Sequence, residues 1–148
     1  MQLLIAVALS QIGKPYLWGH GHPSSGYDCS GFIQYLYDTI GMSPPVDSTA
    51  QGLYDYYTNR PGTQMGTIKP GSLVFYGPAI NKITHIALVL DTNGGGRVIE
   101  AAGGDSSFTL ISTEQQANKR AGVRIRPIKY RKDYLTAIYP SYACIGLI

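Results

Sequence analysis

The chain has 148 residues, of which 44% are hydrophobic and 14% are charged, and its formal net charge is +3. This length fits one domain, residues 1–148, that buries roughly 70% of its unfolded surface without metals, and two cysteines are too few for a disulfide framework. The modest charge comes without a DNA- or RNA-binding motif, so nucleic acid is not an expected partner.

The first predicted element is a helix over residues 2–12. An apolar run from Leu3 to Leu9 resembles the core of a signal peptide, but no charged segment precedes it and no convincing cleavage site follows. The run is also too short to cross a bilayer. We therefore expect a helix that packs on the core and ends at Gly13 and Pro15, with neither an export signal nor a membrane segment in the chain.

A loop rich in turn residues then leads to a cysteine at the start of a second predicted helix. Over residues 29–40, apolar side chains recur at steps of three and four, and Gly41 ends the pattern. Asp28 suits the N-cap position, which places Cys29 in the first turn, where the helix dipole and the free N–H groups favour a thiolate. Cys29 is therefore a candidate nucleophile. The alternatives are a buried structural thiol and a disulfide with Cys144.

The later part of the chain changes from helical to strand patterns. A third helix is expected over residues 48–57, capped by Asp47 or Ser48. Beyond it, runs of β-branched and aromatic residues between turns predict strands over residues 72–76, 84–90, 97–102, 123–128 and 135–139. Residues 108–121 give no clear pattern. Helices first and strands afterwards indicate an α+β fold, in which N-terminal helices pack on an antiparallel sheet.

One predicted strand contains a single ionisable side chain, His85. Asn93-Gly94 favours a hairpin turn after it, and the returning strand brings Glu100 within one diagonal step of His85 on the same face. A carboxylate beside a histidine fixes the imidazole tautomer and stabilises the imidazolium. The two residues are therefore candidates to act with Cys29. Taken singly, each is also compatible with a structural position in a strand.

Four segments, in the same order, resemble the motifs of the NlpC/P60 family of cysteine peptidases, over about residues 5–134. The family motifs are G-x-P-Y-x-W-G, D-C-S-G, P-G-D-L-V-F and a strand that begins H-V. The matching segments are GKPYLWG from Gly13, DCSG from Asp28, PGSLVF from Pro70 and HIALV from His85. Ser72 stands where the third motif has aspartate.

The resemblance implies a papain-like α+β fold and a cysteine endopeptidase. Members of the family hydrolyse amide bonds in the stem peptides of bacterial peptidoglycan, commonly between D-γ-glutamyl and a diamino acid. The resemblance implies Cys29 as nucleophile, His85 as base and Glu100 as third member, a position that is more often histidine, asparagine or glutamine. It implies no metal and no organic cofactor.

The resemblance also points to residues that contact the substrate. Tyr16, from the first motif, is expected to face the catalytic centre, and Asp28 and Ser30 to hold the N-terminal side of the substrate. Trp18 and His20 belong to the same loop and are further candidate contacts. Asp28 is then both helix cap and substrate contact.

Other readings stay open from the sequence. His20, His22 and His85 are a possible zinc set, which would make the chain a metal hydrolase. A non-catalytic module that binds wall peptides or serves phage tail assembly is a second reading, and an acyltransferase of the same superfamily is a third.

We expect the protein to act at the bacterial cell wall. It would be delivered there by phage lysis, a virion or secretion machinery, or as part of a larger protein. A basic segment from Lys119 to Lys132 fits a solvated strand face or contact with an anionic wall polymer. No oligomeric state is predicted.

Overall fold

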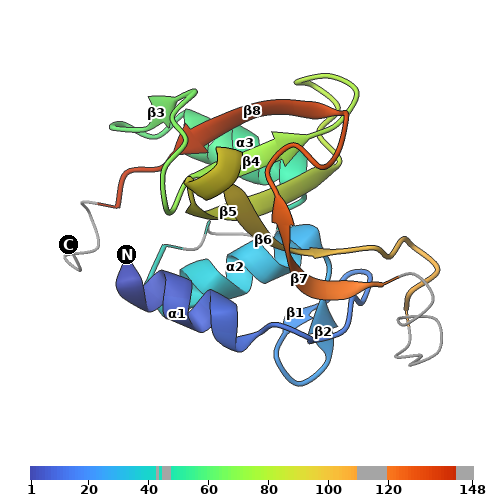
Figure 1. The fold of residues 1–148 in the computed structure, drawn as a ribbon. Helices are drawn as coiled ribbons and strands as arrows, with labels where there is room; N and C mark the ends of the chain where they lie inside the picture. Colours follow the sequence, from blue (N-terminus) through green and yellow to red (C-terminus); the bar gives the residue numbers. More distant parts are fainter. Residues whose placement is uncertain (43, 45–47, 110–119, 143–148) are drawn as a thin grey trace.

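A computed structural model describes residues 1–42, 44, 48–109 and 120–142 of the chain (Figure 1). The helices are α1 (Gln2–Ser10), α2 (Cys29–Thr39) and α3 (Ala50–Thr58), with a short 3₁₀ turn η1 (Asn93–Gly95). The strands are β1 (Gly21–His22), β2 (Gly26–Tyr27), β3 (Gln64–Met65), β4 (Leu73–Tyr76), β5 (His85–Asp91), β6 (Arg97–Ala102), β7 (Gly122–Pro127) and β8 (Tyr134–Tyr139). Among the described residues, no helix has both the length and the apolar character needed to cross a membrane.

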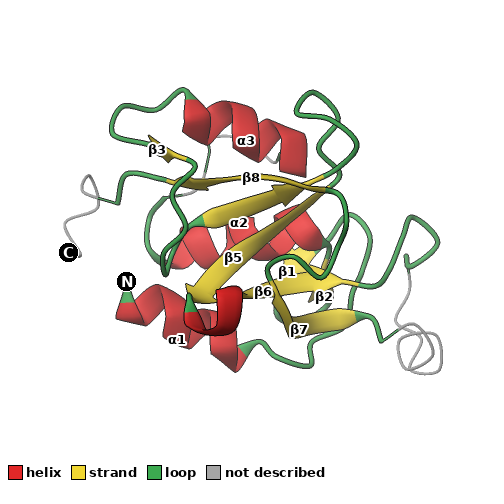
Figure 2. Ribbon diagram, turned by 45° about the horizontal axis from the view of Figure 1, so that its top comes forward, coloured by secondary structure: helices red, strands yellow, loops and turns green. Residues whose placement is uncertain are grey.

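Six strands form one antiparallel sheet in the order β3-β8-β4-β5-β6-β7, and β1 pairs with β2 in a separate hairpin. Helix α2 lies across one face of the large sheet, beside α1 (Figure 2). The predicted α+β architecture with N-terminal helices on an antiparallel sheet is therefore confirmed. The short strands β1, β2 and β3 were not predicted.

The predicted helix boundaries need two corrections. Helix α1 ends at Ser10 instead of residue 12, and the following residues form turns. Helix α3 begins at Ala50, because Thr49 is its N-cap and accepts a hydrogen bond from the backbone N–H of Gly52. Ser48 is therefore not the cap, and the other predicted cap, Asp47, lies outside the described residues.

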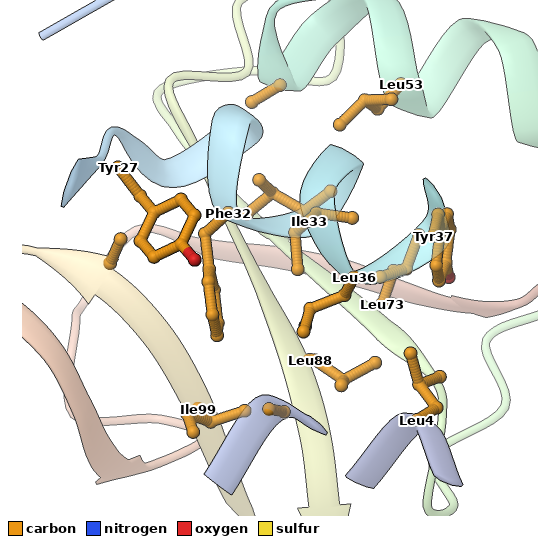
Figure 3. Close-up of a cluster of buried hydrophobic side chains, with 14 of the residues drawn as sticks. Leu4, Tyr27, Phe32, Ile33, Leu36, Tyr37, Leu53, Leu73, Leu88 and Ile99 are labelled. Atoms are coloured by element: carbon orange, nitrogen blue, oxygen red, sulfur yellow. The ribbon is translucent and has the colours of Figure 1, made fainter. Parts of the chain in front are cut away.

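The apolar face of α2 fixes the orientation of the helix that begins with Cys29. Phe32, Ile33, Leu36 and Tyr37 are fully buried on α2. They point into the space between the helix and the sheet, where they meet the residues of the facing strands and of α1 (Figure 3). Burying each such side chain stabilises the fold by about 1.5–3 kcal/mol, so α2 is anchored along its length. Its N-terminus is thereby held next to the start of β5.

The β5–β6 hairpin sets the position of Glu100. Leu88 pairs with Ile99, so continuing this register places Glu100 opposite Ala87, as predicted. The turn itself differs from the predicted two-residue turn at Asn93-Gly94. It is a 3₁₀ turn followed by a glycine with positive φ, and a bulge shifts the register near the end of β5. Because the bulge lies at the turn, it leaves the register near Glu100 unchanged.

The second face of the sheet is also buried. Its apolar residues on β4, β5, β6 and β8 form a cluster with Ile128, which follows β7. Tyr76 belongs to this cluster and donates a hydrogen bond to the backbone carbonyl of Ile128 at 2.6 Å. The connection between β7 and β8 therefore packs over this face, which also bears His85 opposite Tyr76 in the β4–β5 pairing.

Candidate active site

Cys29 is the first residue of α2, as predicted, and its thiol is free and partly exposed. Asp28 caps the helix: its Oδ1 accepts the backbone N–H of Gly31 at 2.7 Å. Its Oδ2 accepts the backbone N–H of Gly19 at 2.9 Å, so the same carboxylate ties the preceding loop to the helix. Cys144, the alternative disulfide partner, lies outside the described residues.

His85 is the first residue of β5, and the thiol of Cys29 reaches it at this end of the sheet. The Cys29 Sγ lies 3.9 Å from the carbonyl oxygen of Thr84, the residue before His85. The His85 side chain is 6% exposed, and its Nε2 lies 2.8 Å from Oε1 of Glu100, whose side chain is completely buried. With Nε2 engaged by Glu100, Nδ1 remains for the thiol. The structure thus brings together the three residues predicted as catalytic.

The pKa of His85 reflects these two partners. Burial alone lowers the pKa of an imidazole, but hydrogen bonds to Cys29 and Glu100, together with their negative charge, raise it from 6.5 to about 9. At neutral pH the ring is therefore protonated. A protonated histidine is the partner that a thiolate requires.

Glu100 has two further partners that the sequence did not predict. Arg124 lies directly opposite it on β7 and places its Nε 3.2 Å from Oε2. The hydroxyl of Tyr130, in the β7–β8 connection, lies 2.8 Å from one carboxylate oxygen and 2.7 Å from the other. Burial raises the pKa of a carboxyl, but the interactions with His85, Tyr130 and Arg124 outweigh it and lower the pKa of Glu100 below its usual value. The carboxylate is therefore ionised although it is buried.

Tyr16, which the resemblance predicts to face the catalytic centre, is near enough to Cys29 to be affected by its charge. It is 5% exposed, and its ring meets the ring of Phe108 edge-on with centroids 6.0 Å apart. Burial and the negative charges of Cys29 and Asp28 raise the pKa of Tyr16 far above its usual range. Its hydroxyl therefore keeps its proton and remains a hydrogen-bond donor at neutral pH.

A polar pocket of about 390 Å³ opens along α2 and the loop before it, and Cys29 is not among its lining residues. Asp28 and Ser30, the two neighbours of Cys29 in the chain, both line it, and His20 lines it from the preceding loop. The rest of the lining comes from polar and small residues of α2, the loop before it and the start of α3: Gly19, Gly21, Gly31, Gln34, Tyr35, Asp38, Ser48 and Thr49. Trp18, a predicted substrate contact, is 49% exposed and does not line this pocket.

The histidines considered as a zinc set are not brought together. His20, just before β1, and His22, the last residue of β1, are exposed, and His22 bonds to Ser24. His85 is buried beside Glu100. Within the described ranges, no three histidine, cysteine, aspartate or glutamate side chains are close enough to hold a metal ion. The described residues therefore show no arrangement of ligands that would support the zinc hypothesis.

The cations expected to form one basic segment serve different partners. Arg124 faces Glu100, and Arg131 forms a bidentate pair with Asp133 at 2.8 and 2.7 Å. Arg126 and Lys129 stack over the rings of Tyr130 and Tyr134, respectively. Lys119 lies outside the described residues. Two of these charges are thus neutralised within the fold.

A helix that presents a cysteine at its N-terminus to a histidine at the start of an antiparallel sheet defines a papain-like α+β protein. The NlpC/P60 family model matches residues 13–126. The chain belongs to the NlpC/P60 family.

Curated relatives share about a third of the aligned residues. The chain is 36% identical over 98 residues to a probable endopeptidase p60 of Listeria grayi, with 66% of this chain and 17% of the relative covered. It is 34% identical over 112 residues to peptidoglycan endopeptidase RipA of Mycobacterium tuberculosis, with 68% and 22% covered. It is 32% identical over 122 residues to peptidoglycan endopeptidase RipB of the same species, with 74% of this chain and 46% of the relative covered. The chain thus spans less than half the length of these relatives.

Solved structures agree with the fold. The crystal structure of an NLP/P60 family protein from Staphylococcus aureus has a TM-score of 0.66 at 26% identity, with 95% of this chain and 41% of that chain covered. The NlpC/p60 domain of the peptidoglycan hydrolase SagA has a TM-score of 0.64 at 25% identity, with 93% and 96% covered. Both similarities extend over nearly the whole described chain, so the papain-like fold predicted from the motifs is confirmed.

Proposed function

We propose that the chain is a cysteine endopeptidase that hydrolyses amide bonds in the stem peptides of bacterial peptidoglycan, with Cys29, His85 and Glu100 as catalytic residues. The observation that supports this most directly is the 2.8 Å contact between His85 and the buried Glu100, on a histidine that also bonds to Cys29. The relatives named as peptidoglycan endopeptidases support the substrate class. Within that class, the expected bond is the one between D-γ-glutamyl and a diamino acid.

The three residues act in successive steps, and His85 carries the proton between them. In the reactive thiolate–imidazolium pair His85 already carries the proton of the Cys29 thiol, and the thiolate attacks the carbonyl carbon of the scissile amide. The C–N bond breaks as His85 returns the proton to the leaving amine, which leaves a thioester on Cys29. His85 then takes a proton from water, and the resulting hydroxide attacks the thioester. The C–S bond breaks, the new carboxyl group leaves, and Cys29 and His85 return to the thiolate–imidazolium pair.

The start of α2 also supplies groups for the oxyanion of the tetrahedral intermediate. The backbone N–H of Cys29 lies in the first turn of the helix, where such groups have no intrahelical partner. The Tyr16 hydroxyl, which keeps its proton, is a second donor in this area. Donors held in place before the reaction stabilise the developing negative charge more than water does.

The polar pocket is the proposed binding site for the part of the peptide that precedes the scissile bond. Asp28 and Ser30, which flank Cys29 in the chain, both line it, although Cys29 itself does not. Asp28 is compatible with two roles, because its Oδ2 accepts one backbone N–H and a carboxylate oxygen has two lone pairs. Ser30 and His20 add a hydroxyl and an imidazole. Trp18 lies outside the pocket and stays a predicted contact only.

A buried ion pair also argues against an inactive binding module. Removing charges from water costs about as much free energy as their pairing returns, so such a pair gives little stability. The His85–Glu100 pair is buried beside a free thiol, where it has a chemical use. Delivery by a phage, a virion or a secretion system stays a prediction.

The experiment that tests this proposal is digestion of purified peptidoglycan, with mass spectrometry of the new termini. Walls with lysine and walls with diaminopimelate are treated separately. We expect a new carboxyl group on D-γ-glutamate and a new free amine on the diamino acid. The matched control is Cys29→Ala, which is expected to release nothing. A folded protein that releases no new amine from either wall overturns the proposal, as does release that a chelator abolishes.

A further inference from the structure

We propose that Arg124 and Tyr130 are positioning residues that hold Glu100 against His85, and that Arg124 sets how strongly the carboxylate acts on the histidine. This inference rests on the proposed function, because it assigns a role to the surroundings of the third catalytic residue. It follows from contacts on one carboxylate. Oε1 meets the His85 ring, Oε2 meets the Arg124 guanidinium, and Tyr130 bonds to both oxygens.

Four formal charges alternate along this line of contacts. They are the thiolate that the proposed mechanism requires at Cys29, the imidazolium of His85, the carboxylate of Glu100 and the guanidinium of Arg124, and they sum to zero. A charged group at the third position needs such a balance, because an unpaired buried carboxylate is costly. A neutral third residue needs none. Arg124 therefore supplies a positive charge that a glutamate at this position requires.

Other titratable groups of the described residues face the pair, and none of these adds an unpaired charge. From β4, Tyr76 lies with its ring centroid 5.4 Å from that of His85 and is neutral, because burial and Glu100 raise its pKa. Arg131 and Asp133 neutralise each other. The groups that face His85 and Glu100 are Cys29 from α2, Tyr76 from β4, Arg124 from β7, and Tyr130, Arg131 and Asp133 from the β7–β8 connection.

Arg124 is held in place by a second contact. Its Nη1 donates to the carbonyl oxygen of Arg120 at 2.6 Å, and its side chain is 21% exposed. The guanidinium therefore keeps its position relative to the carboxylate. As a second cation near Glu100, it partly offsets the effect of the carboxylate's negative charge on His85. Removing it is expected to strengthen the electrostatic effect of Glu100 on the imidazolium and to leave the carboxylate less firmly positioned.

Tyr130 restricts the orientation of the carboxylate. A hydroxyl shared between both oxygens favours one rotation of the carboxylate plane, the one that points Oε1 at His85. Burial and Glu100 raise the pKa of Tyr130 to about 12, so the hydroxyl remains a donor throughout the working range of the enzyme. Tyr130 does not line the polar pocket, so its loss is expected to affect kcat and not KM.

The test combines NMR titration of the His85 ring nitrogens with pH profiles of kcat/KM on a soluble stem peptide. The titration needs no substrate, so a protein without peptidase activity still tests the positioning. The variants are Glu100→Gln, Arg124→Gln and the double variant, with Arg97→Gln as matched control. Arg97 pairs with a carboxylate at the far end of the same hairpin, where it is exposed.

Arg124→Gln is expected to raise the pH at which His85 loses its proton by roughly one unit, because a like charge is removed. Glu100→Gln is expected to lower it, and the double variant to lie between the two. At neutral pH, Arg124→Gln lowers kcat/KM in the wild type but raises it in Glu100→Gln, where the guanidinium is unpaired. Arg97→Gln changes none of these values.

Tyr130→Phe tests orientation separately, with circular dichroism to show that the variant is folded. We expect kcat to fall roughly tenfold with KM unchanged, the effect of losing one hydrogen bond to a charged group. If the His85 titration is the same in Arg124→Gln as in wild type, the assignment of Arg124 is overturned. If Tyr130→Phe keeps its full kcat, the assignment of Tyr130 is overturned. Loss of hydrolysis in all variants, with the titration shifts intact, overturns only the proposed function.

Discussion

His85 and Glu100 lie 2.8 Å apart across the β5–β6 hairpin, with the carboxylate removed completely from solvent. A neutral third residue orients an imidazole but adds no charge to it. A carboxylate does both, and with Cys29 it raises the pKa of His85 to about 9. The thiolate–imidazolium pair is therefore expected to persist further into the alkaline range than it does with a neutral third residue.

Substitution of Glu100 separates orientation from charge. Glu100→Gln keeps a group that bonds to the ring, so we expect substantial activity with the alkaline limb of the kcat/KM profile shifted to lower pH. Glu100→Ala removes orientation as well, and we expect a loss of roughly 10²- to 10⁴-fold. The measurement is a pH–rate profile on one soluble stem peptide. If Glu100→Ala matches the wild type at every pH, Glu100 is an ordinary strand residue.

Asp91→Asn provides the matched control for Glu100→Gln. Asp91 also pairs with an arginine, Arg97, but this ion pair is exposed at the turn end of the hairpin. Exposed ion pairs contribute little to stability, so the variant is expected to be stable and to keep the wild-type pH profile. A shift as large as that of Glu100→Gln would mean that the profile reports the hairpin and not the carboxylate beside His85.

Cys29→Ala is expected to abolish hydrolysis and leave the fold intact. The side chain is partly exposed in the first turn of α2, and the cap at Asp28 does not use the thiol. A small stability change, within about 1 kcal/mol, is typical of such a position. Turbidity clearance of cell walls measures activity, and thermal unfolding followed by circular dichroism measures the fold. A folded Cys29→Ala protein that clears walls contradicts the cysteine mechanism.

The proximity of Cys29, His85 and Glu100 could be predicted because the position of each follows from a local pattern. The cap and the helical period around Cys29 need only neighbouring residues, and a hairpin turn relates His85 to Glu100 over a short stretch of chain. The register of β5 and β6 was right even though the turn type was wrong. The bulge that changes the turn lies near Asp91, beyond the residues that determine this register.

The partners of Glu100 could not be predicted, because they are separated from it by irregular chain. Arg124 becomes its cross-strand neighbour only once the register of β6 and β7 is known, and the connection between these strands has no clear sequence pattern. Tyr130 lies in a turn, where no periodicity indicates the direction of a side chain. The strands β1, β2 and β3 have two residues each, which is too short for an alternating pattern.

The charges of the buried pair also predict how stability depends on pH. The pKa of His85 is raised from 6.5 to about 9, so its contribution is complete below pH 6.5 and is lost as the pH rises through 9. The pKa of Glu100 is lowered from 4.5, so its contribution is present above pH 4.5 and is lost as the pH falls through its folded-state pKa. We expect the Tm difference between wild type and Glu100→Gln to be largest between these limits.

Thermal unfolding of both proteins from acid to alkaline pH measures this difference. Taking the difference removes the titration of groups that the two proteins share. We expect it to shrink above pH 6.5 and to be small beyond about pH 9, where the folded His85 is neutral. A Tm difference that stays constant across the whole range means that the two side chains are not coupled.

Gly31 is required by the close approach of the loop before α2. An added Cβ would overlap the carbonyl oxygen of His20, which is backbone and cannot turn away. Alanine favours a helix over glycine by about 1 kcal/mol, but we expect overpacking of roughly 1–3 kcal/mol to outweigh this in Gly31→Ala. In the control, Gly52→Ala, the nearest atom belongs to the side chain of Ser48, so a near-neutral or stabilising effect is expected. Equal denaturant midpoints for the two variants contradict the prediction.

Gln34, on α2, bonds to a residue on the opposite side of the polar pocket. Its Nε2 donates to the carbonyl oxygens of Ser30 at 3.3 Å and Ser48 at 3.0 Å, and its Oε1 accepts the backbone N–H of Ser48 at 3.1 Å. The amide thus connects α2 to the segment that begins α3, and Ser48 and Thr49 line the pocket. Gln34→Ala removes this connection while the contacts of Cys29 and His85 remain.

We therefore expect Gln34→Ala to raise KM by roughly tenfold, the effect of about 1.4 kcal/mol of lost binding, with kcat within a factor of about two. Gln34→Glu is the finer test, because it keeps an acceptor for the Ser48 N–H but places a carboxylate oxygen against two carbonyl oxygens. It is expected to raise KM at least as much as alanine does. Steady-state kinetics on a soluble stem peptide measure both values. A fall in kcat with KM unchanged would show that Gln34 acts on the reacting residues, and that the polar pocket does not bind the substrate.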